Sequence, residues 1–333
     1  MRLLWSLIPV ASTSIACLLA AILAVPAIAP FPIPVSLVRK PSGTKSAVLF
    51  AVSGSGPNSP VVLAPILFVR GGKFFETPHP SLDGETAASA QFARSYFAAN
   101  KSYRLIFGGR QVGTVRVVRL NPPSPGVTFN AAGQIQQGKV HLGGPVKALA
   151  TDATRLVLKG SGRRAPSKLE RAQAIKLARE AFRNRGISEA EIQAMQVVNL
   201  TACDLNADGS FELIGSFSVA SRVHSAAVRQ NDAAAQQPAS GGGDWTAQQN
   251  LFCILEPAGG GGYRFGRSEY HASKSEDGVD VEEQTLLDAV DLDNDGVYEV
   301  VTQSNFYESW AYDLYQKVGG TWKAVYHSYG GGA

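Results

Sequence analysis

Short apolar runs separated by glycine turns dominate the first half of the chain. The runs occupy residues 46–52, 60–78 and 103–120, and they are rich in β-branched and aromatic residues. Gly71 and Gly72 interrupt the second run, and Gly108 and Gly109 interrupt the third. Paired glycines favour tight hairpins because the central residues of such turns take positive φ. The pattern predicts a β-rich domain over residues 30–160.

One helix is expected inside this domain. The apolar residues that share one helical face are Phe92, Ala93, Tyr96 and Phe97. Their three- and four-residue spacing is the helical period, and Ser81 or Asp83 upstream could cap the first turn.

Residues 165–196 form a second, purely helical segment. Two capping boxes begin its helices, Ser167 to Glu170 and Ser188 to Glu191. The predicted apolar stripe of the first helix is Leu169, Ala172, Ile175, Ala178 and Phe182, and Gly186 ends it. The exposed face is basic, with Lys168, Arg171, Lys176, Arg179 and Arg183. Such a face could contact an acidic surface or simply be solvated.

The last third of the chain contains an internal repeat. Residues 199–214 align without gaps on residues 286–301, with seven identities in sixteen positions. A strand, a glycine turn and another strand follow each copy. Residues 222–246, rich in Ala, Gln, Ser and Gly, are predicted to be a mobile insert in the first copy. The fold class expected is therefore α+β and mainly β, ending in a repeat domain over residues 197–333.

The N-terminus is typical of an export segment. Arg2 precedes an apolar stretch from Leu3 to Leu23, and Ala27 and Ala29 offer a small-residue cleavage site. Residues 1–29 are accordingly expected to be a cleaved signal peptide or an uncleaved membrane anchor. This places the protein in the periplasm, at the cell surface or outside the cell. Contact with the membrane is expected only through this segment, if it is uncleaved.

Two cysteines, Cys203 and Cys253, remain after removal of such a segment. An exported chain could join them in one disulfide, or each could be a small buried residue on a strand. The sequence leaves both possibilities open.

Charge is distributed unevenly along the chain. Residues 1–200 hold 24 Lys and Arg against 8 Asp and Glu, a balance of +16. Residues 201–333 hold 7 against 19, a balance of −12, and the two sum to the net +4. The basic half could attract an acidic envelope polymer, or the halves could attract each other. Nucleic acid is not expected as a partner, because no recognition motif is present.

The repeated segments carry an acidic turn that predicts a metal site. Its ligands in the second copy are the side chains of Asp291, Asp293, Asp295 and Glu299 and the carbonyl of Val297. The equivalents in the first copy are Asp204, Asn206, Asp208 and Glu212, with the carbonyl of Ser210. Ca²⁺ prefers six to eight oxygen ligands, whereas Mg²⁺ requires stricter octahedral geometry. Two Ca²⁺ sites are therefore predicted, and the second, with four carboxylates against three, should bind more tightly.

The spacing excludes an EF-hand. That loop needs a bidentate glutamate at position 12, where this chain has Gly215 and Thr302. With a glutamate at position 9 and a strand directly after it, each turn resembles the DxDxDG calcium loops of FG-GAP and VCBS-type repeats. The resemblance covers the two loops and the strands after them. It implies propeller-blade-like strands and the ligand residues given above.

No catalytic motif is present, so no catalytic residues are assigned. The hypothesis favoured is an exported calcium-binding β-repeat protein acting as a binding or structural module at the cell envelope. One alternative is a calcium-dependent hydrolase of polysaccharide or phosphate esters, using Glu308 among aromatic residues with Glu282 or Glu283. Another is a subunit of a surface complex, with the aromatic residues 306–315 or the basic helix face as its contact.

Overall fold

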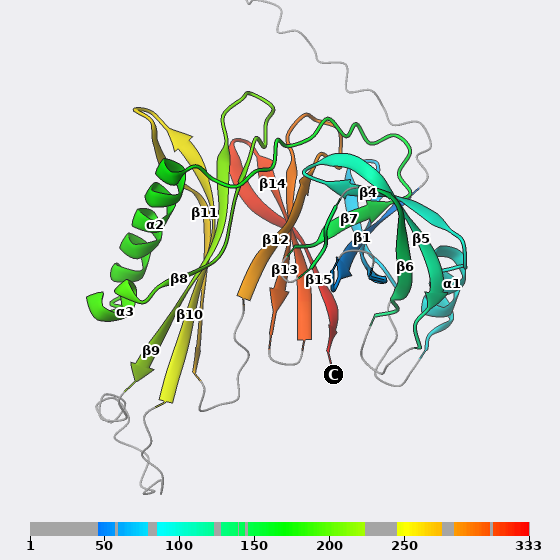
Figure 1. The fold of residues 1–333 in the computed structure, drawn as a ribbon, viewed down its shortest axis with the longest axis horizontal. Helices are drawn as coiled ribbons and strands as arrows, with labels where there is room; N and C mark the ends of the chain where they lie inside the picture. Colours follow the sequence, from blue (N-terminus) through cyan, green and yellow to red (C-terminus); the bar gives the residue numbers. More distant parts are fainter. Residues whose placement is uncertain are drawn as a thin grey trace, which may run out of the picture. The chain divides into compact units, whose positions relative to one another are not determined.

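A closed six-stranded barrel forms the N-terminal part of the computed structural model (Figure 1). The order around it is β1-β7-β4-β5-β6-β2, and β2 pairs with β1 to close it. The strands are β1 (Ala47–Gly54), β2 (Val61–Arg70), β4 (Ser102–Phe107), β5 (Arg110–Leu120), β6 (Ala131–Gly138) and β7 (Ala148–Thr151). The short β3 (Lys73–Glu76) extends the sheet beyond β2. The predicted β-rich character of this region is confirmed.

The structure describes residues 46–56, 59–78, 85–122, 128–138, 140–143, 146–223, 245–274, 283–306 and 309–332, all within one compact unit. The predicted signal or anchor segment and nearly all of the predicted insert lie outside these residues.

Both predicted glycine hairpins are present. Gly71 and Gly72 join β2 to β3, and Gly108 and Gly109 join β4 to β5, all with φ between 57° and 71°. The barrel interior is filled by apolar side chains that include Phe50, and α1 (Ala87–Tyr96) and its C-cap residue add Phe92 and Phe97 to the same core. The N-cap of α1 is Thr86, whose hydroxyl accepts from the backbone N–H of Ser89. The predicted caps Ser81 and Asp83 precede the helix and lie outside the described residues.

Two four-stranded antiparallel sheets follow, one for each copy of the aligned segment. The first contains β8 (Gln196–Cys203), β9 (Glu212–Val223), β10 (Trp245–Ala258) and β11 (Gly262–Lys274). The second contains β12 (Glu283–Val290), β13 (Glu299–Asn305), β14 (Ser309–Val318) and β15 (Thr321–Gly332). In both sheets each strand pairs with the next along the chain, and the acidic turn joins the first strand to the second.

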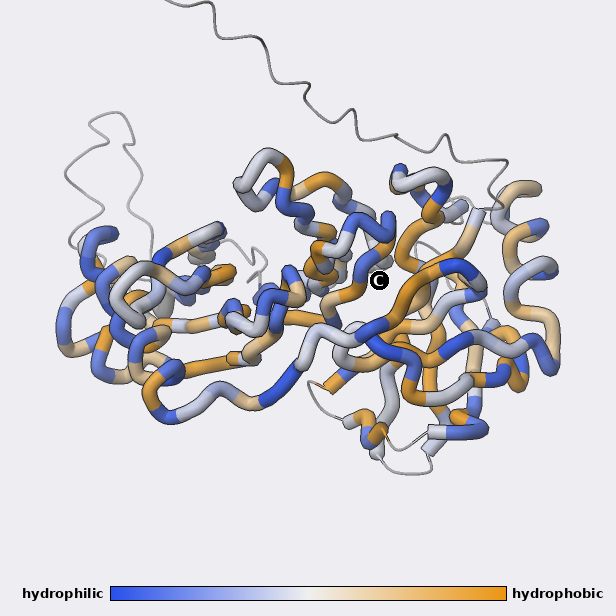
Figure 2. Tube along the Cα trace, turned by 90° about the horizontal axis from the view of Figure 1, so that it is seen from above, coloured by the Kyte–Doolittle hydropathy of each residue, from blue (hydrophilic) through white to orange (hydrophobic). Residues whose placement is uncertain are grey.

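Buried apolar clusters join these parts in sequence. α2 (Lys168–Arg183) and α3 (Glu189–Gln193) pack on one face of the first sheet, as Figure 1 also shows. The opposite face of that sheet packs on the second sheet, and the second sheet packs on the barrel. Figure 2 shows how apolar and polar stretches alternate along the Cα trace. β1 is a nearly continuous apolar run because it is buried on both sides, with Phe50 inside the barrel and Leu49 against the second sheet.

Both predicted helices are present between residues 165 and 196, but the predicted buried face of the first is partly wrong. Both capping boxes form, each with reciprocal hydrogen bonds between serine and glutamate. The buried residues of α2 are Ala174, Ala178 and Phe182, whereas Leu169 is 66% exposed. The first turn instead carries the capping box and the Glu170 ion pair with Arg164 at 2.7 Å, so its apolar residue stays at the surface.

The two cysteines are free thiols in the structure rather than a disulfide. Cys203 lies on β8 and Cys253 on β10, with β9 between them. Strands two apart are roughly 10 Å apart, beyond the reach of a disulfide. The thiols also face different cores, one between the sheets and one beneath the helices. Burial raises the pKa of both thiols to about 12, which makes them unreactive.

The β4–β5 turn docks on the second sheet through a buried ion pair. The carboxylate of Asp288 on β12 accepts from the backbone N–H groups of Gly108 at 3.1 Å and Gly109 at 3.4 Å. The Arg163 guanidinium lies 3.1 Å from the same carboxylate and stacks on the Phe107 ring, 4.5 Å from its centroid. Because Arg163 belongs to the basic half of the chain and Asp288 to the acidic half, this contact is one case of attraction between the halves.

Replacing Gly109 with alanine should destabilise this junction. An added Cβ would lie 2.8 Å from the Ala289 carbonyl oxygen and 2.9 Å from the Ser161 nitrogen, and φ is +67°. Gly320, with φ +80° and nothing within 4 Å of an added Cβ, is the matched control. We expect the control variant to cost about 1–2 kcal/mol from positive φ alone. Gly109→Ala should cost about 1–3 kcal/mol more from overpacking, as measured by urea unfolding. Equal losses would contradict the docking described here.

Candidate metal centre

The two acidic turns have matching backbone conformations. Ala207 in the first turn and Asn294 in the second are aligned, and both have positive φ, at 56° and 61°. The aligned glycines, Gly209 and Gly296, have φ of 85° and 94°. Few non-glycine residues adopt positive φ, so this shared feature indicates that both segments fold into the same turn.

Hydrogen bonds within the turns also match. The carboxylates of Asp291 and Asp204 each accept from the backbone N–H groups four and five residues later, at 3.0–3.1 Å. Those of Asp295 and Asp208 accept from the N–H two residues later, at 2.8 and 2.7 Å. The glutamate after each turn accepts from the N–H seven residues earlier, at 2.7 Å in the second copy and 3.0 Å in the first. The acidic side chains therefore hold the turns in shape.

In the second turn three carboxylates converge. One oxygen from each of Asp291, Asp293 and Glu299 lies within 4.8 Å of the others. Asp291 is 7% exposed and Glu299 1% exposed. Burial, reinforced by the neighbouring carboxylates, raises the pKa of all three carboxyls, that of Glu299 to about 8. A cation placed among the three carboxylates would offset the free-energy cost of keeping them ionised and close together.

The remaining predicted ligands of the second turn lie outside this group. Asp295 is exposed and its Oδ1 accepts from the backbone N–H of Val297. Val297 is half-buried and packs beside the core between the two sheets.

One residue that the sequence pattern did not indicate reaches the cluster from β14. The Gln316 amide nitrogen lies 2.8 Å from Asp293 Oδ2 and 3.2 Å from Glu299 Oε1. Gln316 is seventeen positions after Glu299 and meets it only because β13 and β14 pair. Strand register was the signal needed to find it.

The first turn is looser. Its three carboxylates, from Asp204, Asp208 and Glu212, do not form a group within 4.8 Å; across the described part of the chain, the second turn supplies the one such group. The Asn206 amide donates to Asp208 Oδ2 at 2.9 Å. Asp208 is exposed, and Ser210, whose carbonyl was a predicted ligand, is exposed as well.

Both turns contact the segment that connects the barrel to α2. The Asn294 side-chain oxygen accepts from the Val157 N–H at 2.9 Å, and the Tyr298 hydroxyl donates to the Gly160 carbonyl at 3.0 Å. The Tyr298 N–H donates to the Leu205 carbonyl at 2.7 Å, which joins the turns directly. The candidate centre therefore lies at the junction between the barrel and the two sheets.

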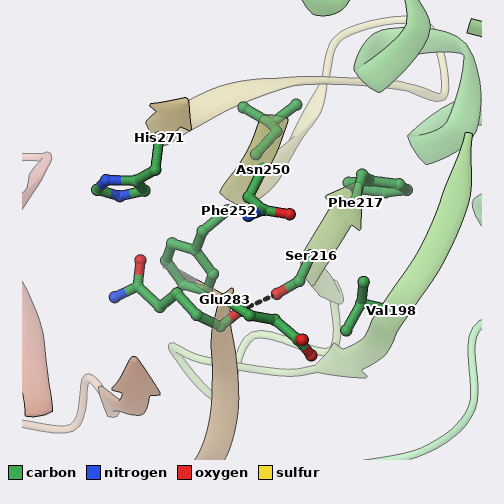
Figure 3. A pocket seen from close by; sticks show the side chains of 9 residues that line it. Val198, Ser216, Phe217, Asn250, Phe252, His271 and Glu283 are labelled. Carbon is green, nitrogen blue, oxygen red and sulfur yellow. Dashed lines mark hydrogen bonds between the residues drawn. The ribbon is translucent and has the colours of Figure 1, made fainter. Parts of the chain in front are cut away.

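Among the described residues, the pocket beside Glu283 gives the hydrolase alternative no room for a substrate. Glu308 and Glu282 lie outside them. Glu283 lines a pocket between the first sheet and β12, together with Asn250 and His271 (Figure 3). The centre of a water molecule can move through only about 10 Å³ of it, which is room for one water. A sugar ring or phosphate ester would not fit this pocket.

The aromatic residues proposed as a contact surface are partly used inside the fold. Tyr312 is 2% exposed and lies in the core between the second sheet and the barrel. Trp310 packs beside it. The Tyr312 ring cannot serve a partner while that core is intact.

Comparisons with known proteins place the chain in no group. No family model matches it, and neither a curated protein nor a solved structure does. Among the described residues, no helix is long and apolar enough to cross a membrane.

Proposed function

We propose that the chain binds Ca²⁺ at its second acidic turn, and more weakly at the first, and that the ion stabilises the junction between the barrel and the sheets. The observation that carries this proposal is the convergence of Asp291, Asp293 and Glu299 within 4.8 Å. The matching turn at residues 204–212 supports it, since the same hydrogen bonds recur there.

The donor set fits a hard cation. Asp291, Asp293 and Glu299 offer oxygen atoms alone, with no soft sulfur or imidazole among them. These residues would hold the ion, with Asp295 and the Val297 carbonyl as further predicted ligands. We expect Ca²⁺ rather than Mg²⁺, because Ca²⁺ accepts flexible sets of oxygen ligands whereas Mg²⁺ requires near-octahedral geometry.

The role proposed for the protein is a calcium-stabilised β-repeat module at the cell envelope. Export through the N-terminal segment would bring the chain to compartments where weak, structural Ca²⁺ sites are common. The blade-like four-stranded sheets and the barrel offer surface for binding an envelope polymer or protein. The basic face of α2 is partly neutralised by the Arg183–Glu189 ion pair at 2.8 Å.

The ranking of the two turns tests the proposal. We expect isothermal titration calorimetry with CaCl₂ to show a stronger and a weaker site. Asp293→Ala should remove the stronger one because it deletes a converging carboxylate, and Asp208→Ala should remove only the weaker one. If Asp293→Ala is harmless while Asp208→Ala abolishes the stronger site, the assignment is wrong.

A further inference from the structure

Two adjacent residues on β14 make contacts with different sheets, one at the second acidic turn and one beside the first. Gln316 and Lys317 are consecutive on a strand, so their side chains point to opposite faces of the second sheet. Gln316 reaches the second turn, with its amide nitrogen 2.8 Å from Asp293 Oδ2. Lys317 reaches the first sheet, where its ammonium lies 2.7 Å from Glu256 Oε1.

Strand register makes Gln316 and Glu256 equivalent. Val300 pairs with Tyr315, so the next residues, Glu299 and Gln316, are neighbours across β13 and β14. In the first sheet Leu213 pairs with Leu255. Glu212 and Glu256 then occupy the corresponding places across β9 and β10. Each turn's glutamate therefore has one cross-strand neighbour, an amide in the second copy and a carboxylate in the first.

The Gln316 amide is placed as a ligand would be. With Ca²⁺–oxygen bonds of about 2.3–2.6 Å, ligand atoms around the ion lie roughly 3 Å apart. The amide nitrogen is 2.8 and 3.2 Å from oxygens of two candidate ligands. Turning the amide by half a rotation places its oxygen there instead. The site would then gain a neutral oxygen from outside the turn.

Glu256 is unable to play this part in the first copy. Its carboxylate is already bound by Lys317, by the Arg264 guanidinium at 2.9 Å and by the Trp322 indole N–H at 3.0 Å. Lys317 also brings a positive charge close to the first turn. Glu256, whose carboxylate holds the ammonium, is the cross-strand neighbour of Glu212 in that turn. A fixed ammonium beside these acids competes with a metal ion.

We propose that Gln316 and Lys317 set the difference in Ca²⁺ affinity between the two turns. Gln316 supplies a further oxygen ligand to the second site, and the positive charge of Lys317 offsets part of the negative charge at the first. This inference rests on the proposed function. It adds two residues, adjacent in sequence, whose effects on metal binding have opposite sign.

Two substitutions test the pair by calorimetric titration with CaCl₂. Gln316→Leu should weaken the stronger site about tenfold, the worth of one hydrogen-bonding group, and leave the weaker site unchanged. Lys317→Met should strengthen the weaker site by about tenfold or more, because it removes a competing charge. In the Lys317→Met variant, the Glu256 carboxylate keeps Arg264 and Trp322 as partners. Lys176→Met, on an exposed face of α2, makes the same change in net charge and should alter neither site.

Melting temperatures with a chelator separate ligand from scaffold. If Gln316→Leu lowers the melting temperature of the metal-free protein but leaves the stronger site unchanged, Gln316 is a structural residue only and the inference fails. It fails equally if Lys317→Met leaves the weaker site unchanged. If the wild-type chain binds no Ca²⁺ at all, the proposed function itself is wrong, a result that differs from either of these.

Discussion

Replacing Asp288 with alanine is expected to lower the free energy of unfolding by about 3–5 kcal/mol, the usual cost of breaking a buried ion pair on one side. Asp288 is fully buried, and its partner Arg163 has a side chain only 9% exposed. The substitution leaves the guanidinium without its carboxylate and removes the acceptor of the Gly108 and Gly109 N–H groups. Urea unfolding at neutral pH measures the loss.

Controls distinguish this ion pair from ordinary surface charge. Glu180 pairs with Lys176 at 3.9 Å on the exposed face of α2, and Glu180→Ala should cost about 0.5 kcal/mol or less. Replacing Asp288 with leucine and Arg163 with methionine together should recover much of the loss, since no charge is then left unpaired. A loss below about 1 kcal/mol for Asp288→Ala would show that the barrel and second sheet are not joined in this way.

Calcium should stabilise the wild-type protein by about 2.7 kcal/mol when present at one hundred times its dissociation constant. The gain arises because the ion binds the folded state, where Asp291, Asp293 and Glu299 converge, and not the unfolded chain. Asp291→Asn should abolish most of it, since the amide keeps the size of the side chain but not its charge. Thermal unfolding in CaCl₂ and in chelator measures the difference.

The aligned substitution Asp204→Asn is the matched control. It makes the same chemical change in the other turn and should leave most of the stabilisation in place. If the two substitutions reduce the calcium-dependent stabilisation equally, both turns contribute alike to it. That result would contradict the assignment based on carboxylates that converge only at the second turn. If calcium does not stabilise the wild-type protein, the proposed metal site is wrong.

Local features were predictable from the sequence. The glycine hairpins, the capping boxes and the acidic turns each depend on residues within about ten positions of one another. Their chemistry therefore appears as a short pattern. The positive φ of Gly209 and Gly296 follows from the same local logic.

Features set by distant pairing could not be found in this way. Closure of the barrel depends on β1 pairing both with β2, the next strand along the chain, and with β7, about a hundred residues later. The Asp288–Arg163 contact spans 125 positions. Leu169 was expected to be buried because it shares a helical face with Phe182, but it is exposed. Helical spacing predicts which residues share a face, but not how far along the helix the sheet extends. Gln316 and Lys317 became visible only through strand register.

Equilibrium dialysis of the wild-type protein against calcium measures the proposed binding itself, because it counts bound ions without relying on a stability change. We expect saturable binding, with the tighter ion lost in Asp291→Asn and retained in Asp204→Asn. Binding that is absent, or that survives Asp291→Asn unchanged, would contradict it.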